Sequence, residues 1–181
     1  MYISPTALKV WAYHYGSKRS ITRESFHNQF QEEDIFLKRV EDTPDIMNLY
    51  HRMSMEVSDL DWMDGAICCF DEAFPVIDKN IPLRDKPYLL FYKGDISLLD
   101  DINQNVAVIG YTTPTETIQA RERNIVQHLV REGQCIVSGL AKGCDGVAHT
   151  ACMEAGGKTI AILPTPLNAI YPAAHKEMVR Q

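Results

Sequence analysis

Residues 138–149 read SGLAKGCDGVAH, and they bring three glycines, a lysine, an aspartate and a histidine together directly after the apolar run Cys135–Val137. Glycines let the backbone approach an anion closely, and the N-terminus of a helix offers N–H groups with partial positive charge. Lys142 adds a mobile positive charge and Ser138 adds a hydroxyl. We therefore interpret this stretch as a loop for an anion, namely a phosphate of a nucleotide or a nucleic acid.

The same stretch also has a purely structural interpretation. Glycine-rich turns occur wherever a helix packs tightly on a sheet, and Asp145 is placed to cap the helix that follows. His149 lies four residues after Asp145 on the same helix face, but no nucleophile is placed to use such a pair. The sequence contains neither a Walker Lys-Ser ending nor a G-x-G-x-x-G with a ribose carboxylate. We expect no catalytic residue and no cofactor.

A second loop with similar chemistry follows the buried strand predicted at Val106–Ile109. Gly110 ends this strand, and the hydroxyl of Thr112 follows. The run TPTE predicts a helix with Thr113 as N-cap, Pro114 at its first position and Glu116 completing a capping box.

Residues 105–181 repeat the order strand, loop, helix. Strands are predicted at Val106–Ile109, Cys135–Val137 and Thr159–Leu163, and helices connect them. Such crossovers produce parallel strands, so the predicted fold class is α/β, a Rossmann-like parallel sheet with helices on both faces. Ligands bind such sheets outside the carboxyl ends of the strands, where the loops 110–115 and 139–145 and the segment 164–171 would meet. One more helix is predicted to start at Tyr171-Pro172.

The earlier part of the chain predicts a small helical N-terminal region over residues 1–70. The apolar spacing from Leu8 to Tyr15 predicts one helix, a second is predicted over about 24–40, and a third is predicted to begin with Thr43 as N-cap. Residues 71–104 contain several prolines and predict an extended lead-in with a short strand in YLLFYKG. The expected divisions are 1–70, 71–104 and 105–181.

Composition limits the class of protein. The chain has 181 residues, a net charge of -6 and five cysteines without a Cys-x-x-Cys pair. A globally basic nucleic-acid surface is thereby excluded, although a local basic cleft is not. We expect no disulfide framework and no metal site. The N-terminus lacks a signal-peptide pattern and no apolar run approaches membrane-spanning length, so we expect a cytoplasmic protein without a membrane partner.

Several motifs in the second half of the chain resemble those of one family. SGLAKGCDGVAHTACMEAGGKTIAIL resembles the signature of the DprA/Smf family of DNA-processing proteins, S-G-hydrophobic-A-x-G-I-D-x-x-A-H, followed by a helix, a glycine and T-I-A-V-L. FPVIDKNIPLRDKPYLLFYKGDISLL resembles the family's lead-in, and LNAIYPAAH is similar to its later Tyr-Pro-x-x-Asn stretch. The resemblance covers about residues 70–181. It implies a Rossmann-like domain that binds single-stranded DNA without hydrolysis and helps load the recombinase RecA during DNA uptake by natural transformation.

The resemblance also implies a set of binding residues. Lys142 corresponds to a phosphate contact and the backbone around it to a phosphate nest, while Gly110 and Thr115 match on the first loop. Together with the loop chemistry above, this predicts a DNA- or phosphate-binding set: Gly110, Tyr111, Thr112, Thr115, Ser138, Gly139, Leu140, Ala141, Lys142, Gly143 and Asp145.

Three features depart from the family pattern. Where the family has Gly-Ser-Arg, this chain has Gly110-Tyr111-Thr112, and the missing arginine is expected to weaken DNA binding by about 1–3 kcal/mol. Family members continue past the position of Gln181 through further strands with dimer and recombinase contacts, so we expect either a truncated product or a minimal relative, and a homodimer is one expected assembly. The first ~70 residues do not resemble the family's usual N-terminal domain.

Two alternatives stay open. The wider superfamily includes the cytokinin-activating LOG proteins, so the same crevice would suit a binder or sensor of a small nucleotide. A nucleotide phosphoribohydrolase of that superfamily would carry Pro-Gly-Gly-x-Gly-Thr followed by a glutamate. The corresponding stretch here reads PTPLNAIYP, which places the enzyme last.

Overall fold

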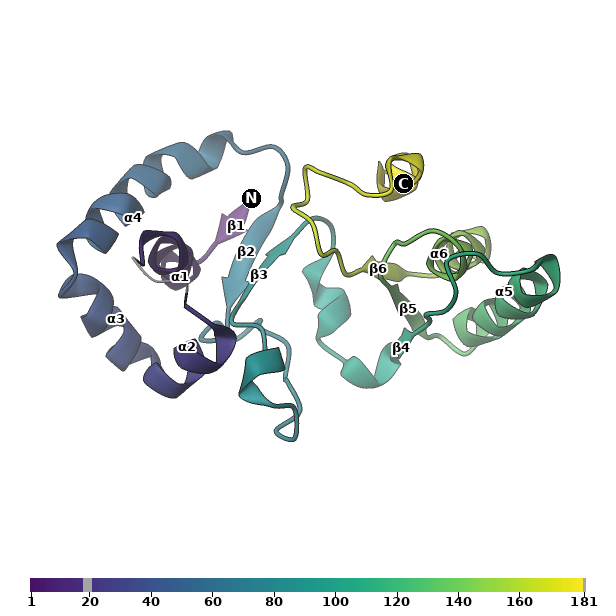
Figure 1. Cartoon of the computed structure of the whole chain (residues 1–181), viewed down its shortest axis with the longest axis horizontal. Coiled ribbons are helices and arrows are strands. Elements are labelled where there is room, and N and C mark those ends of the chain that lie inside the picture. Colours follow the sequence, from purple (N-terminus) through teal and green to yellow (C-terminus); the bar gives the residue numbers. More distant parts are fainter. Residues whose placement is uncertain (18–20, 181) are drawn as a thin grey trace. The chain divides into compact units, whose positions relative to one another are not determined.

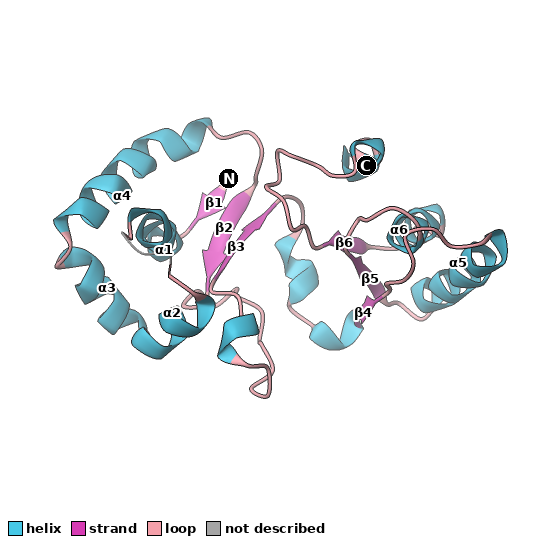
Figure 2. Cartoon of the chain, viewed as in Figure 1, coloured by secondary structure: helices cyan, strands magenta, loops and turns pink. Residues whose placement is uncertain are grey.

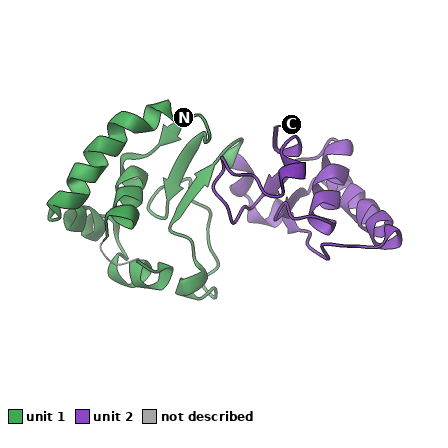
Figure 3. Ribbon diagram, turned by 45° about the horizontal axis from the view of Figure 1, so that its top comes forward, with its two compact units in different colours: residues 1–96 green, residues 97–181 purple. Residues whose placement is uncertain are grey.

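The computed structural model describes residues 1–17 and 21–180, and it divides the chain into two compact units, Met1–Ile96 and Ser97–Gln181 (Figure 3). Each unit has its own three-stranded sheet and its own apolar core. Helices and strands are mixed in both units (Figure 2), which confirms the α/β class. The boundary between the units falls inside the segment predicted as an extended lead-in.

The first unit contains a small mixed sheet and four helices. Its elements are β1 (Tyr2–Ile3), α1 (Pro5–Gly16), α2 (Arg23–Gln29), α3 (Glu33–Glu41), α4 (Pro44–Glu56), β2 (Gly65–Cys68) and β3 (Leu89–Tyr92). β1 pairs with β2 in parallel, and β2 pairs with β3 antiparallel. Figure 1 shows α2, α3 and α4 arranged around α1, which packs on α4 and on β2. This packing buries an aromatic core that includes Phe26, Phe30 and Phe36.

Several local predictions for this unit need correction. The prediction of helices alone before residue 70 missed β1 and β2, which are too short to show the period of a strand. A continuous helix over 24–40 is wrong, because α2 ends at Gln29 and α3 begins at Glu33. The break lets Phe26, Phe30 and Phe36 pack edge to face, with ring centroids 5.1 and 5.2 Å apart for the two consecutive pairs.

The second unit contains the predicted order of strands and helices. Its elements are β4 (Asn105–Ala107), α5 (Glu116–Arg131), β5 (Cys135–Ser138), α6 (Cys144–Glu154) and β6 (Thr159–Ala161). The strands are parallel in the order β4-β5-β6, with Val106 paired to Ile136 and Ile136 paired to Thr159. α5 and α6 pack against one another, and both contact β5, so the two long helices cover the same face. Their small side chains permit this close packing: Ala148 and Ala151 are fully buried.

Two helix starts in this unit differ from the prediction. The N-cap of α5 is Thr115, not Thr113, and its hydroxyl accepts the N–H of Ile118 at 3.4 Å. Glu116 then occupies the first turn, where the helix dipole favours a negative charge. The helix predicted at Tyr171-Pro172 is only a 3-10 turn at Ala173–His175. No helix in the described residues is both long enough and apolar enough to cross a membrane.

Candidate nucleic-acid interface

Three loops of the second unit meet at the first turn of α6. Because β4, β5 and β6 are parallel, their carboxyl ends share one edge of the sheet, and each loop leaves that edge. Gly143 lies against the first loop, since a Cβ at Gly143 would stand 2.3 Å from the carbonyl oxygen of Tyr111. Gly146 lies against the turn that follows the third segment, since a Cβ there would stand 2.8 Å from Cε1 of His175. Glycine at both positions therefore permits the loops to converge.

The carboxylate of Asp145 organises the loop between β5 and α6 from inside. Its Oδ2 accepts the N–H of Gly139 at 3.1 Å and the N–H of Ala141 at 3.2 Å, and Asp145 is only 8% exposed. Leu140, between them, has a φ of 61° and a buried side chain. These two N–H groups were predicted to bind an external anion. They instead donate to the Asp145 carboxylate, an anion within the protein. Asp145 shapes the loop, and an anion has to use the N–H groups outside it.

The side chain of Ser138 forms a hydrogen bond inside the protein and does not face a ligand. Its hydroxyl is buried and donates to the carbonyl of Val108 at 2.7 Å, so it ties β5 to the end of β4. The backbone continues this tie, because the N–H of Val108 donates to the carbonyl of Val137 at 2.9 Å. The side chains of Ser138 and Leu140 consequently face the protein, and these residues offer a ligand only their backbone.

The exposed part of the predicted set lies on the two loops beside α6. Tyr111, Thr112 and Thr115 are exposed on the first loop, and Lys142 is exposed on the turn before α6. The carbonyl of Tyr111 accepts the N–H of Cys144 at 3.0 Å, which fixes this loop to the helix start. Lys142 forms no ion pair within residues 1–17 and 21–180, so its ammonium group is available to an anion.

Sequence reasoning missed two contacts of this region. His175 donates from Nδ1 to the carbonyl of Leu140 at 2.9 Å, and the only hint was its place at the end of YPAAH. The thiol of Cys144 lies in the electrostatic neighbourhood of the carboxylate of Glu122, which is buried on α5. Burial raises the pKa of the Cys144 thiol, and the neighbouring Glu122 carboxylate adds to this effect. No local pattern relates residues 122 and 144, so this pair exists only in the folded chain.

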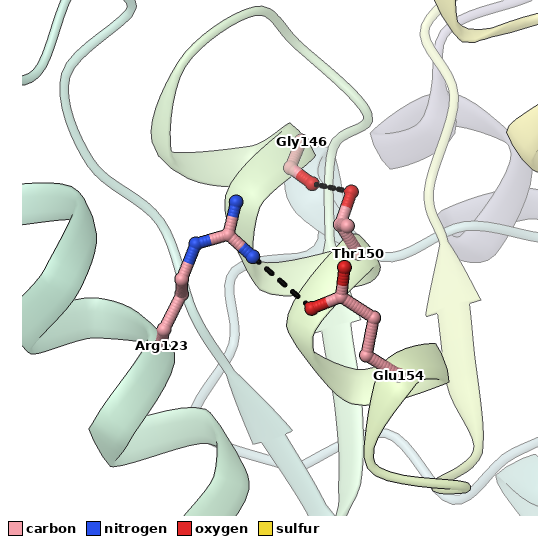
Figure 4. A network of polar contacts seen from close by, with 4 residues as sticks. All are labelled: Arg123, Gly146, Thr150 and Glu154. Atoms are coloured by element: carbon pink, nitrogen blue, oxygen red, sulfur yellow. Dashed lines mark hydrogen bonds and ion pairs between the residues drawn. The ribbon is translucent and has the colours of Figure 1, made fainter.

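One ion pair joins α5 to the C-terminal end of α6, and one hydrogen bond lies within α6 (Figure 4). Arg123 on α5 pairs with Glu154 on α6, with 3.2 Å between Nη1 and Oε2. The hydroxyl of Thr150 donates to the carbonyl of Gly146 at 2.7 Å, within the first turns of α6. Arg123 therefore serves the packing of the two helices, and it does not add to a basic surface at the loops.

His149 is a buried neutral histidine. Its Nδ1 lies 2.7 Å from Oγ1 of Thr159, whose hydroxyl donates to the carbonyl of Ile136 at 2.8 Å, so Nδ1 carries the proton and donates to Thr159. The pairing of His149 with Asp145 considered from the sequence is not formed, because the Asp145 carboxylate binds the loop N–H groups. Burial of this ring, which is 2% exposed, lowers the pKa of His149.

The lowered pKa predicts a loss of stability in acid. The unfolded chain takes up a proton at His149 near pH 6.5, whereas the folded chain resists protonation until a lower pH. The free energy of unfolding is therefore expected to fall below about pH 6.5, by at most about 1.4 kcal/mol per pH unit from this residue. Thermal melts at about pH 7.5 and 5.5 should show a smaller shift for His149→Asn than for the natural chain. His128→Asn, at an exposed position on α5, is the control and should retain the full shift.

The net charge is unevenly divided between the two units. Residues 1–96 contain 11 Lys and Arg against 16 Asp and Glu, whereas residues 97–181 contain 7 against 8. The unit with the loops is thus nearly neutral, and the acidity belongs mainly to the other. Binding of a polyanion would rely on the local arrangement at α6 and not on a general basic field. Within the described residues, no cluster of three or more His, Cys, Asp or Glu side chains is placed to hold a metal ion.

In comparison with known proteins, the second unit and the end of the first unit match a known family. The family described as DNA recombination-mediator protein A matches residues 65–181. DNA processing protein DprA of Streptococcus pneumoniae is 40% identical over 111 residues, which are 59% of this chain and 38% of that protein. DNA processing protein DprA of Bacillus subtilis is 32% identical over 109 residues, which are 58% of this chain and 36% of that protein. This chain therefore matches well under half the length of these relatives.

The fold comparison extends further along the chain. The X-ray structure of DprA from Streptococcus pneumoniae is similar with a TM-score of 0.61 and 28% identity, covering 97% of this chain and 58% of that one. Its coverage includes nearly all of the N-terminal region, which the family pattern does not match. The first ~70 residues therefore depart from the family pattern in sequence, as expected, whereas the fold similarity extends over nearly all of them.

Proposed function

This chain belongs to the DNA recombination-mediator protein A family, and from this premise we propose that it binds single-stranded DNA through the loops at the first turn of α6. The observation that carries the proposal is the convergence of the loops at Gly143, beside the exposed Lys142, which has no ion-pair partner among the described residues. Helix N-terminus, glycine backbone and lysine together suit a phosphate of the strand.

In this proposal the phosphate lies on the outer side of the loop. Asp145 occupies the N–H groups of Gly139 and Ala141, and its negative charge disfavours a second anion in the interior. The phosphate would instead contact the Lys142 ammonium and the backbone at Lys142 and Gly143, with the exposed hydroxyl of Thr112 nearby on the facing loop. These contacts position a strand without attacking it, so the proposed activity is binding without hydrolysis.

We extend the proposal to the role that the family resemblance implies. The bound strand would be passed to a RecA-type recombinase during DNA uptake and recombination in the cytoplasm. A homodimer is part of this proposal, since a second copy would supply a second strand-binding site. Because the chain spans 38% of the Streptococcus pneumoniae relative, these partner contacts are proposed and have to be measured on this chain itself.

Fluorescence anisotropy with a labelled strand of about 30 nucleotides, at low and at physiological salt, tests the binding proposal. We expect salt-sensitive binding that excess single strand competes and that duplex DNA and mononucleotides do not. The contrary result would be no strand binding, with a mononucleotide raising the melting temperature instead. That result would favour the sensor of a small nucleotide that the same crevice also suits.

Lys142→Ala is expected to weaken binding of the strand by roughly tenfold at physiological salt, because one charge-assisted phosphate contact is lost. The slope of log affinity against log salt should become shallower by about 0.7, the value for one phosphate of a single strand. The melting temperature should stay nearly unchanged, since Lys142 is exposed and forms no ion pair in the described part of the chain.

Lys158→Ala is the matched control for this measurement. Lys158 is also exposed in the second unit, but it directly precedes β6 at the amino edge of the sheet. Its removal should leave both the affinity and the salt slope unchanged. If both lysines had equal effects on DNA binding, a diffuse charge contribution would replace the specific contact at Lys142.

A further inference from the structure

Tyr111 presents an exposed aromatic ring beside the proposed phosphate contact. The residue is 73% exposed, and its ring contacts no other aromatic ring in the part of the chain that the structure describes. Tyr15, which is 71% exposed in the first unit, differs because its ring lies against those of Trp11 and His14. Exposure alone is therefore not the distinguishing feature. The Tyr111 ring, without an aromatic neighbour among the described residues, is accessible to a partner from solvent.

The backbone beneath this ring is fixed. The carbonyl of Tyr111 accepts the N–H of Cys144 at 3.0 Å, which joins the loop to the first residue of α6. Gly143 packs directly below, and a Cβ there would overlap both Tyr111 and Thr112. Gly110 is held in the same way, since a Cβ there would stand 2.7 Å from Sγ of Cys144. The ring is thus carried by an ordered loop, so little backbone entropy is lost when a ligand packs on it.

Few positive charges surround Tyr111, so electrostatic attraction alone gives little affinity, and base stacking would add to it. Tyr111 and Thr112 stand where the related sequence pattern has Ser and Arg, so the loop has a π-face in place of a guanidinium group. The unit carries 7 basic against 8 acidic residues, so phosphate attraction is modest. Stacking on an aromatic ring is independent of charge and accepts every base.

We propose that Tyr111 is a base-stacking residue for an unpaired nucleobase of the strand whose phosphate contacts Lys142 and Gly143. The inference rests on the proposed function and adds the basis of its selectivity. A base can lie flat on the Tyr111 ring only when it is released from a duplex, whereas the phosphate contact is available to any nucleic acid. Selection of single strands over duplex thus resides in the first loop.

The test compares two labelled strands of about 30 nucleotides, one of thymidines and one of abasic sites with the same phosphates, each titrated with the full chain. The natural chain should bind the thymidine strand more tightly. Tyr111→Phe should keep this preference, because the π-face remains. Tyr111→Ala should reduce the preference about 5- to 150-fold, the range for one stacked base, and leave the affinity for the abasic strand unchanged. Tyr15→Ala, at the similarly exposed tyrosine of the first unit, should alter neither.

The possible outcomes distinguish a failure of the stacking proposal from a failure of the proposed DNA binding. Equal binding of both strands by the natural chain, or an equal loss for both strands in Tyr111→Ala, would overturn stacking while phosphate binding stands. Absence of binding to either strand would overturn the proposed function and the stacking with it. The melting temperature of Tyr111→Ala should match that of the natural chain, which excludes a loss of binding through unfolding.

Discussion

Replacing Asp145 with alanine is expected to lower the free energy of unfolding of the second unit by about 2–4 kcal/mol. The carboxylate is 8% exposed and accepts the N–H groups of Gly139 and Ala141, at 3.1 and 3.2 Å. Truncation removes two charge-assisted hydrogen bonds and leaves both donors in a loop closed by neighbouring segments. Because the same bonds hold Leu140 in its left-handed conformation, the loop should relax, and binding of the strand should weaken as well.

Two variants make this prediction specific. Asp145→Asn retains an oxygen that can accept from the loop, so its loss should be less than half that of the alanine variant. Asp101→Ala is the matched control in the same unit, because the exposed carboxylate of Asp101 also accepts two hydrogen bonds, from Asn103 and Gln104. An exposed carboxylate of this kind should contribute less than about 1 kcal/mol. Denaturant titration of all three variants measures the differences, and similar losses at positions 145 and 101 would contradict the internal role of Asp145.

Gly143→Ala is the second change with a large expected effect, on the order of 3 kcal/mol of destabilisation. Gly143 has a φ of 83° and a ψ of -128°, a conformation that side chains disfavour. A Cβ would also stand 2.3 Å from the carbonyl oxygen of Tyr111, which belongs to the backbone and cannot rotate away. The first loop would have to move, and its hydrogen bond to Cys144 would be strained or lost.

Gly133→Ala separates the two causes. Gly133 ends the turn after α5 with a φ of 80°, but a Cβ there would meet nothing within 4 Å. Its cost should be only the conformational one, about 1–2 kcal/mol, and DNA binding should be unaffected. Gly143→Ala should cost more and should also abolish selective binding of the thymidine strand, because Tyr111 is displaced. If the two alanine variants unfolded at the same denaturant concentration, the close approach of the loops would have no energetic consequence.

Asp145→Ala and Lys142→Ala together test where an anion would lie. A carboxylate inside the loop and a phosphate at the same N–H groups would repel one another, since like charges a few ångströms apart interact strongly where water is displaced. The internal carboxylate therefore leaves only the outer surface at Lys142 and Gly143 for phosphate. On this account Asp145 contributes to binding through the shape of the loop, whereas Lys142 contributes through its charge.

The α/β unit of residues 105–181 was predictable because its signals are local. Short apolar runs such as Cys135–Val137 and glycines at their ends mark buried parallel strands, and the spacing of apolar residues marks α5 and α6. The glycine-rich stretch after Cys135–Val137 likewise indicated a turn into a helix, and the order of several motifs indicated the family. Strands, helix faces and motifs each depend on residues that are close in sequence, so a sequence pattern is sufficient to predict them.

Contacts between distant residues were decided only by the tertiary structure. β1 has two residues and β2 has four, so only pairing with other strands defines them. The position of Asp145 relative to Gly139 depends on a left-handed Leu140, a conformation that its residue type does not suggest. The closeness of Tyr111 to Gly143, and with it an exposed ring beside Lys142, arises because neighbouring parallel strands bring their loops to one edge. The sequence by itself determined which chemical groups this protein has, whereas folding decided which of them are used internally and which face a ligand.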